Sequence, residues 1–445
     1  MKTFILILLV LIPLKNLTGQ QPMTFIEADT STFRAYLDSD WDRIIEVGTT
    51  AIDNGIDYYY LRLRIAYAYF MKGRYQKAIP HYKKLLEFSN NDPTGLEYLY
   101  YCYRYTARDA DAEKLAGRFT PALKNFLGKE DRKPLTGIGI NSTFGTGADP
   151  SLKDDVSQTA PQDIDGSQIL PNSFMNFNFE ISHGIQRSII VHHSANLLNK
   201  DEYAFAVVNS TPYISESQKI RQFSYHLSAD VTPVEGLTLS PLFSYINYRV
   251  PIFYEYGAGS GNKRSVYSYD SHSELVTGIK LEKNLGIVTL SLAGSLSNLN
   301  LSKQNTAAAS LTILPLGNLN LYLTANGYLH GQKQRDAAIQ QFMHSYTLGF
   351  KIAKHLWLEG YSTFGEFSNL YDPFSELTYN SLELYKNISS ISLIIPLYKS
   401  GASLFAGARL YKSESMFVPV EDVFGSTNSR EINYQSFTFG ISWKL

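Results

Sequence analysis

The sequence predicts an α + β protein, in which a short domain of helical repeats precedes an antiparallel transmembrane β-barrel of about 14 strands, with about 12 or 16 as alternatives. Three observations predict this fold. The chain opens with an apolar export segment, and near Pro134 the spacing of apolar residues changes from the helical period to a period of two. No later segment approaches the roughly 18 to 20 unbroken apolar residues that a membrane helix needs. The expected boundaries are 1–19 for a signal peptide, 20–130 for the helical repeats and 134–445 for the barrel.

The first residues have the layout of a secretory signal peptide. Lys2 supplies the positive start, an apolar run extends from Phe4 to Leu14, and small or polar residues lead through Gly19 to Gln20. The apolar run is too short to remain as a permanent membrane helix. We therefore expect the chain to be exported.

Composition narrows the classes of partner and chemistry. A net charge of -1 provides no electrostatic footprint for nucleic acid. The single cysteine, Cys102, cannot form an internal disulfide. There is no Cys/His metal spacing and no glycine-rich phosphate loop, so we expect no metal, no cofactor, no catalytic residue and no enzyme.

Helical periodicity from Phe25 to Phe126 divides into three units of about 34 residues. The middle unit is the clearest, with a first helix, a turn at Gly73 and a second helix. Ile65, Ala66 and Tyr69 lie on one face of the first helix, Tyr75 belongs to the turn with Gly73, and Ala78 and Tyr82 begin the second helix.

This pattern resembles the tetratricopeptide-repeat family over about a quarter of the chain. The outer units depart from it, because no tryptophan occupies the usual first-helix site and the repeat-ending proline is shifted to Pro93. The resemblance implies a concave surface that holds a partner protein. The residues expected on that surface are Tyr59, Tyr69, Tyr75 and Tyr103. The alternative is that the helices only pack against the barrel.

Beyond Pro134, apolar and polar residues alternate in segments of about ten. From Leu319 to His330, for example, leucines and an alanine share one face while asparagines, tyrosines and a threonine share the other. In a membrane barrel the apolar face contacts lipid and the polar face lines the lumen. The last segment, Tyr434 to Leu445, places aromatic residues on one face and resembles the signal by which barrel-assembly machinery recognises its substrates.

Short turns alternate along this region with long polar links such as 249–265 and 367–378, as in barrels whose turns are periplasmic and whose loops are external. An even number of strands then leaves both chain ends in the periplasm. The segment Asp201 to Ser210 stays open, since it extends one strand or forms a hairpin within a loop.

Repeats followed by a barrel resemble the YaiO-like family and, more loosely, the barrels that export lipoproteins. The resemblance implies the outer membrane of a Gram-negative bacterium, with the N-terminal domain in the periplasm. Outer-membrane lipid, the barrel-assembly machinery and a periplasmic or envelope protein bound by the repeats are the expected partners.

Charged residues in the predicted strands are expected to face inward, because a basic residue at the lipid midplane costs about 2 to 4 kcal/mol and an acidic one less. They would form a selectivity lining or pair with one another in a plugged lumen. These residues are Glu180, Asp230, Glu274, Lys280, Glu359 and Arg409.

One constellation has the residue types of acyl hydrolysis. His192 and Ser194 share a strand face, and a histidine can activate a serine. The segment faintly resembles the His-x-Ser element of outer-membrane lipid A deacylases, but no acid is evident nearby. The alternative is a pair of polar residues on the lumen face.

These features favour an outer-membrane barrel whose repeats recruit a partner in export, assembly or envelope maintenance. The alternative is a passive or selective solute channel of porin type. A lipid-modifying hydrolase is the distant third.

Overall fold

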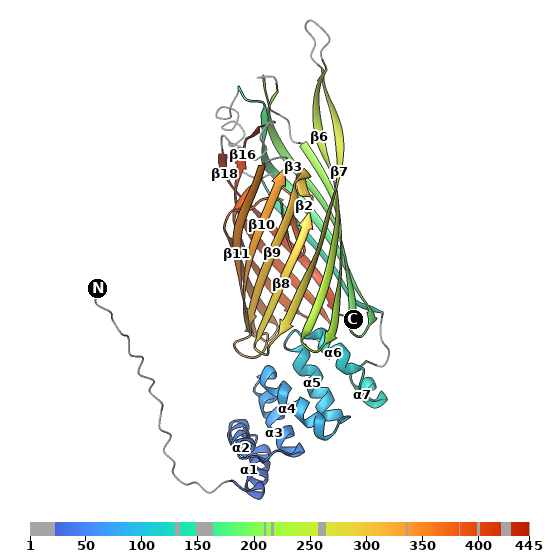
Figure 1. Ribbon diagram of the computed structural model, residues 1–445, viewed down its shortest axis with the longest axis vertical. Coiled ribbons are helices and arrows are strands. Elements are labelled where there is room, and N and C mark those ends of the chain that lie inside the picture. The colour runs from blue at the N-terminus through green and yellow to red at the C-terminus, as the bar shows by residue number, and fades with distance from the viewer. Residues whose placement is uncertain are drawn as a thin grey trace, which may run out of the picture.

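The computed structural model describes residues 23–129, 134–147, 163–208, 211–214, 218–256, 264–334, 337–381, 383–397, 401–419 and 429–444. It consists of a small helical domain below a tall barrel (Figure 1). The end of the barrel that meets the helices is the near end, and the opposite one is the far end. The predicted signal peptide, residues 1–19, lies outside the described residues.

Six helices of the N-terminal domain pack in chain order, each against the next, and a short seventh follows. They are α1 (Phe25–Leu37), α2 (Trp41–Asp53), α3 (Tyr59–Met71), α4 (Tyr75–Phe88), α5 (Pro93–Arg104), α6 (Asp109–Ala116) and α7 (Pro121–Phe126).

Local sequence signals set several helix ends. Thr24 and Glu27 form a reciprocal capping box at the start of α1, and the Asp92 side chain accepts a hydrogen bond from the Gly95 amide where α5 begins. After α3 the chain turns at Gly73, whose φ of 68° favours glycine.

Alternating small and large residues form the core of the helical domain. Ala66 and Ala78 are fully buried beside Ile65, Tyr82 and Leu85. Gly48 on α2 allows the closest approach, because a Cβ there would lie 2.6 Å from the Ile65 side chain. Burial of these apolar side chains is the main source of the domain's stability.

Fourteen of the described strands form a closed antiparallel barrel. They are β1 (Leu135–Thr146), β2 (Gly166–Gln186), β3 (Ile189–Val208), β5 (Gln218–Val234), β6 (Leu237–Tyr256), β7 (Arg264–Asn284), β8 (Val288–Ser297), β9 (Lys303–Ile313), β10 (Leu321–Gln334), β11 (Ala337–Ala353), β12 (Leu356–Phe364), β15 (Leu384–Pro396), β16 (Ala402–Met416) and β18 (Ser429–Lys444). Pairing of β1 with β18 closes the ring. The predicted fold class and strand number are confirmed.

The structure resolves two features of the long links. Asp201 to Val208 extends β3, which pairs further with the short β4 (Thr211–Ile214). Strands β6 and β7 continue as a paired hairpin beyond the far end of the barrel wall (Figure 1). Much of the predicted loop from Arg249 to Ser265 is therefore strand. The backbone pairing of β6 with β7 continues beyond the residues in which apolar and polar side chains alternate.

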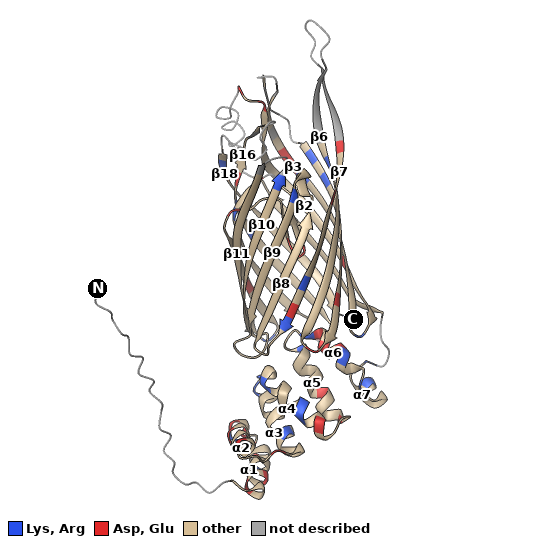
Figure 2. Ribbon diagram, in the orientation of Figure 1, with Lys and Arg blue, Asp and Glu red and all other residues tan. Residues whose placement is uncertain are grey.

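The two faces of the wall differ in polarity as a membrane barrel requires. Leu323, Leu329 and Leu348 are exposed on the outer face. Thr324 and Asn326, between those leucines, line an internal cavity. Charged residues gather in the helical domain and toward the strand ends (Figure 2). No helix within the described ranges is long and apolar enough to cross a membrane.

The helical domain docks directly on the near end of the barrel. Glu235, in the turn between β5 and β6, pairs with Lys83 of α4 at 2.8 Å and with Arg108 at 3.0 Å. The backbone N–H of Gln76 donates to the Gly317 carbonyl in the turn between β9 and β10. These contacts place α6 at the lower end of the lumen (Figure 1).

Candidate functional site: the barrel lumen

A segment following β12 folds back into the barrel and fills the lumen toward the far end. This lumen hairpin, residues 367–381, carries two short strands, β13 (Leu370–Asp372) and β14 (Leu377–Tyr379), which pair only with each other. Tyr371 is buried in a cluster with Leu242, Ile246 and Val276. The sequence-based interpretation of 367–378 as a polar outer loop was wrong, because its apolar residues pack inside the barrel.

Polar contacts anchor the lumen hairpin to three places on the wall. The Asn380 side chain donates to Glu274 at 2.8 Å, and the Gln332 amide donates to the Ser368 carbonyl at 3.0 Å. Just after the hairpin, Glu383 accepts from Lys200 at 3.0 Å. Buried polar groups need such partners, so these contacts fix the position of the hairpin.

Open space remains between the lumen hairpin and the helical domain. A cavity of about 300 Å³, the inner cavity, lies directly against the hairpin residues Asp372, Phe374 and Tyr379. A second cavity of about 760 Å³, the rim cavity, extends down to α6. Both are lined by Lys280, Glu282, Thr312 and Thr324, so the two cavities adjoin along these residues, and together they are called the chamber.

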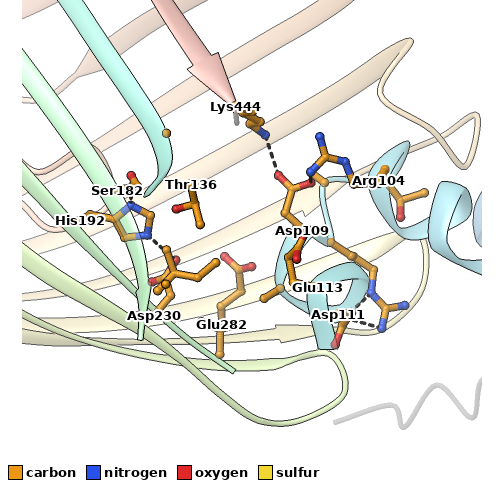
Figure 3. A pocket seen from close by; sticks show the side chains of 18 of the residues that line it. Arg104, Asp109, Asp111, Glu113, Thr136, Ser182, His192, Asp230, Glu282 and Lys444 are labelled. Carbon is orange, nitrogen blue, oxygen red and sulfur yellow. Dashed lines mark hydrogen bonds and ion pairs between the residues drawn. The ribbon is translucent and has the colours of Figure 1, made fainter. Parts of the chain in front are cut away.

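Ion pairs surround the rim cavity where α6 meets the barrel (Figure 3). Lys444, near the end of β18, pairs with Asp109 at 2.6 Å, and Arg104 also contacts this carboxylate. Burial acts to raise the pKa of Asp109, but Lys444 and Arg104 outweigh it and hold that pKa below its usual value. In the same way Lys83 overcomes the effect of burial and keeps the pKa of Glu235 low. Both carboxylates are thus charged at neutral pH and bind the helical domain to the rim.

The six charged strand residues named from the sequence all have lumen-side contacts. Glu180, Asp230 and Lys280 line the rim cavity. Glu359 accepts a hydrogen bond from Tyr322, which lines the same cavity. Farther up, Glu274 holds the lumen hairpin, and Arg409 interacts with Tyr379 of that hairpin and with Tyr411.

The four tyrosines expected on the repeat surface occupy different environments. Tyr69 and Tyr103 are buried in the core of the helical domain, which removes them from any exposed surface. The Tyr59 hydroxyl donates to Asp92 at 2.8 Å, and the Tyr75 ring packs against Phe70. Sequence spacing identified these aromatic positions without separating those that fill the core from those that face solvent.

The predicted contact between His192 and Ser194 is absent from this site. The Ser194 hydroxyl donates to Asn178 at 2.7 Å instead. His192 contacts Ser182 on β2 and Asp230 on β5. The acid that could not be found near His192 in the sequence comes from a neighbouring strand, because antiparallel pairing joins positions 38 residues apart.

Comparison with known proteins gives distant structural likenesses. No protein-family model and no curated protein matches the chain, so neither comparison supports the expected tetratricopeptide or YaiO-like identity. Among solved structures, a Pseudomonas aeruginosa FadL homologue is 9% identical, with a TM-score of 0.43 over 77% of this chain and 97% of that one. The P. putida toluene transporter TodX is 6% identical, with a TM-score of 0.45 over 73% of this chain and 92% of that one. A point mutant of MamA is 16% identical, with a TM-score of 0.21 over 22% of this chain and 72% of that one.

Proposed function

We propose that the protein is a gated solute channel of the outer membrane, with its helical domain on the periplasmic side. The observation that carries this proposal is the open space in the lumen, which extends from α6 to the lumen hairpin as two adjoining cavities. A barrel stabilised only by a filled interior would have no need of this space.

Displacement of the lumen hairpin would leave the wall intact. Its two strands are not part of the barrel sheet, and one isolated bridge, Phe367 to Tyr385, joins its start to the wall. Displacing it breaks side-chain contacts such as Asn380 to Glu274, whereas the barrel ladder stays paired. The hairpin therefore acts as the gate.

The chamber suits small polar solutes. Its wall between β8 and β11 carries hydroxyl and amide side chains, among them Ser291, Ser310, Thr347 and Asn326. Charges of both signs, Lys280 and Glu282, lie in the part shared by the two cavities. Such a lining replaces the hydration of a polar solute and gives weak preference for either sign of charge.

Planar-bilayer recording tests the proposed channel. Replacing residues 368–381 by a short Gly-Ser linker should convert a mostly closed protein into one with steady conductance, since the space filled by the lumen hairpin becomes continuous with the chamber. A silent deletion variant that still migrates as a folded barrel in unheated gels would contradict the proposal.

A reversible lock gives the matched control. Gln332→Cys combined with Ser368→Cys places two thiols at positions linked by a side-chain hydrogen bond of 3.0 Å, within reach of a short bismaleimide that contains a disulfide. This crosslinker should abolish the openings of the full-length protein, and reduction of its disulfide should restore them. Each single cysteine variant should respond to neither treatment.

We also propose a second candidate, recruitment of an envelope protein by the helical domain. One observation favours it: α1, at the end of the helical domain away from the barrel (Figure 1), exposes Ile26, Phe33 and Leu37 by 74%, 47% and 65%. An apolar stripe on a terminal repeat helix is a typical interface. Crosslinking of the full-length protein in cells should yield a heteromeric adduct that Phe33→Asp removes, and an unchanged adduct pattern would count against it.

A further inference from the structure

Four side chains from adjacent strands form a hydrogen-bonded relay on the wall of the rim cavity. The Ser182 hydroxyl lies 2.8 Å from His192 Nδ1, and His192 Nε2 lies 3.3 Å from Asp230. Ser240 donates to the other oxygen of Asp230 at 2.6 Å. All four residues line the cavity, and Figure 3 shows His192 between Ser182 and Asp230.

We propose that Ser182, His192 and Asp230 form a nucleophile–base–acid triad that hydrolyses carboxylic esters in the rim cavity. A serine needs an adjacent base to become a nucleophile, and the base needs an acceptor that fixes its orientation. Each ring nitrogen of His192 therefore has one of these two partners, the serine or the acid. The imidazole uses Nδ1 toward serine and Nε2 toward the acid, which requires the tautomer with its proton on Nε2.

The triad is accessible to a ligand in the rim cavity. The side chains of His192 and Asp230 are 37% and 35% exposed to the cavity, so the triad is not sealed within the wall. Opposite Ser182, in the register of β1 with β2, stands Gly137, which carries no side chain over the serine. A carbonyl carbon can therefore approach the Ser182 oxygen from the lumen.

A donor for the developing oxyanion lies next to this gap. The register of β1 shifts between Leu135 and Gly137, which makes Thr136 the extra residue of a β-bulge beside Ser182. Thr136 lines the cavity, and its hydroxyl is buried without a hydrogen-bond partner in the described part of the chain. An unpaired hydroxyl beside the nucleophile can donate to a tetrahedral intermediate once a bound substrate draws it toward the cavity.

The proposed reaction conserves atoms and charge. The Ser182 oxygen bonds to the ester carbonyl carbon while its proton passes to His192 Nδ1. The carbon–alkoxy bond then breaks, and the alkoxy oxygen leaves as an alcohol with that proton. A water molecule next attacks the acyl-serine and gives its proton to His192, after which the carboxylic acid leaves and the Ser182 hydroxyl is restored. Ester and water give acid and alcohol.

The cavity limits the substrate to an ester that reaches the near end of the barrel. Its volume of about 760 Å³ accommodates a small or medium-sized molecule, and its lining includes Arg187 and Lys280 as well as carboxylates. We assign the substrate to esters whose alcohol or acyl part is polar, since a long alkyl chain would lie against charged groups.

A fluorophosphonate probe tests the triad directly. Folded full-length protein in detergent should become labelled, and peptide mass spectrometry should place the adduct on Ser182. Ser182→Ala should abolish labelling, while His192→Gln and Asp230→Asn should slow it by on the order of 100-fold. Hydrolysis of p-nitrophenyl acetate should fall in parallel in all three variants.

Ser194→Ala is the matched control, because this serine is also near His192 in sequence but bonds to Asn178. It should label at the wild-type rate. Absence of labelling from a wild-type protein that shows the gel shift of a folded barrel overturns the proposal, as does equal labelling of Ser182→Ala. Channel recordings do not enter this result, so failure of the triad and failure of the channel are separate outcomes.

Discussion

At the scale of single residues, His81 shows how packing in the helical domain determines the pKa of a side chain. Its ring stacks on Tyr69 and its Nδ1 lies 3.0 Å from the Arg62 guanidinium, which also binds Asp57. Burial lowers the pKa of His81 to about 4, and Arg62 acts in the same direction. The neutral imidazole is therefore part of the folded state.

This burial predicts an acid-sensitive helical domain. The folded pKa lies below the unfolded value of 6.5, so the contribution is complete above pH 6.5 and is lost as the pH falls from there to about 4. The effect on the free energy of unfolding amounts to about 3 kcal/mol. His81→Gln should therefore lose less stability than the wild type between pH 7 and 4.5, measured by urea unfolding at 222 nm.

Carboxylates titrate in both proteins, so the difference between them isolates His81. His183→Gln changes a residue of the barrel and serves as the control. In this variant the helical domain should unfold at the wild-type urea midpoint at both pH values. Equal acid sensitivity of the wild type and His81→Gln would show that the imidazole is already solvated in the folded state.

Residue-level prediction from the sequence is most definite where a single physical rule decides the outcome. The cost of a charge in lipid indicates which face of a strand Glu180 or Lys280 occupies. It failed for Tyr69 and Tyr103, because an aromatic residue in a repeat is equally suited to a core or a groove. The contact between His192 and Asp230 depends on strand register, which local sequence does not encode.

At the scale of elements, the barrel strands follow from alternation and the lumen hairpin does not. Residues Phe367, Tyr371 and Phe374 lack a period of two, and their partners lie on strands far away in sequence. The run of aromatic residues in a supposed outer loop was the available signal, since exposed loops seldom carry so many. Only the closed wall reveals which space such a segment fills.

The contact between α6 and the rim is a second element-scale feature, and it predicts a local effect of one charge. Glu235→Gln removes the carboxylate shared by Lys83 and Arg108 and leaves the nearly buried Arg108 with fewer partners. We expect faster hydrogen exchange across α6, by about five- to tenfold, with the barrel unchanged. Exchange measured by mass spectrometry checks this.

Glu431→Gln provides the comparison, because its ion pair with Lys412 is half-exposed and remote from the helices. Exposed pairs of this kind contribute little to stability, because water and salt screen them. The exchange of α6 should be the same in this variant as in the wild type. If α6 exchanges its amide hydrogens in Glu235→Gln as slowly as in the wild type, the ion pairs of Glu235 are not needed for docking. The backbone contacts would then hold the helical domain on the rim.

At the scale of the whole molecule, the two parts have different sources of stability. The barrel is a closed ladder without edges, while the helical domain depends on apolar packing around residues such as Ile65. On heating in detergent, the signal at 222 nm should be lost before the barrel loses its compact gel mobility.

Gly48→Val tests that separation. Its Cβ would meet the Ile65 side chain at 2.6 Å, and overpacking of this kind costs about 1 to 3 kcal/mol. The helical transition should move to lower temperature while the gel mobility of the barrel persists to the wild-type temperature. A coincident shift of both would mean that the two parts unfold as one unit.

The docking of the helical domain has a consequence for the order in which the protein is made. The helices are synthesised first, yet the barrel residues that they contact are spread over the rim. These residues are Arg187 after β2, Glu235 after β5, Gly317 after β9 and Lys444 in β18. These four residues reach their final relative positions only after β18 has paired with β1. Docking of the N-terminal helices at all four sites therefore requires β18 to be in place.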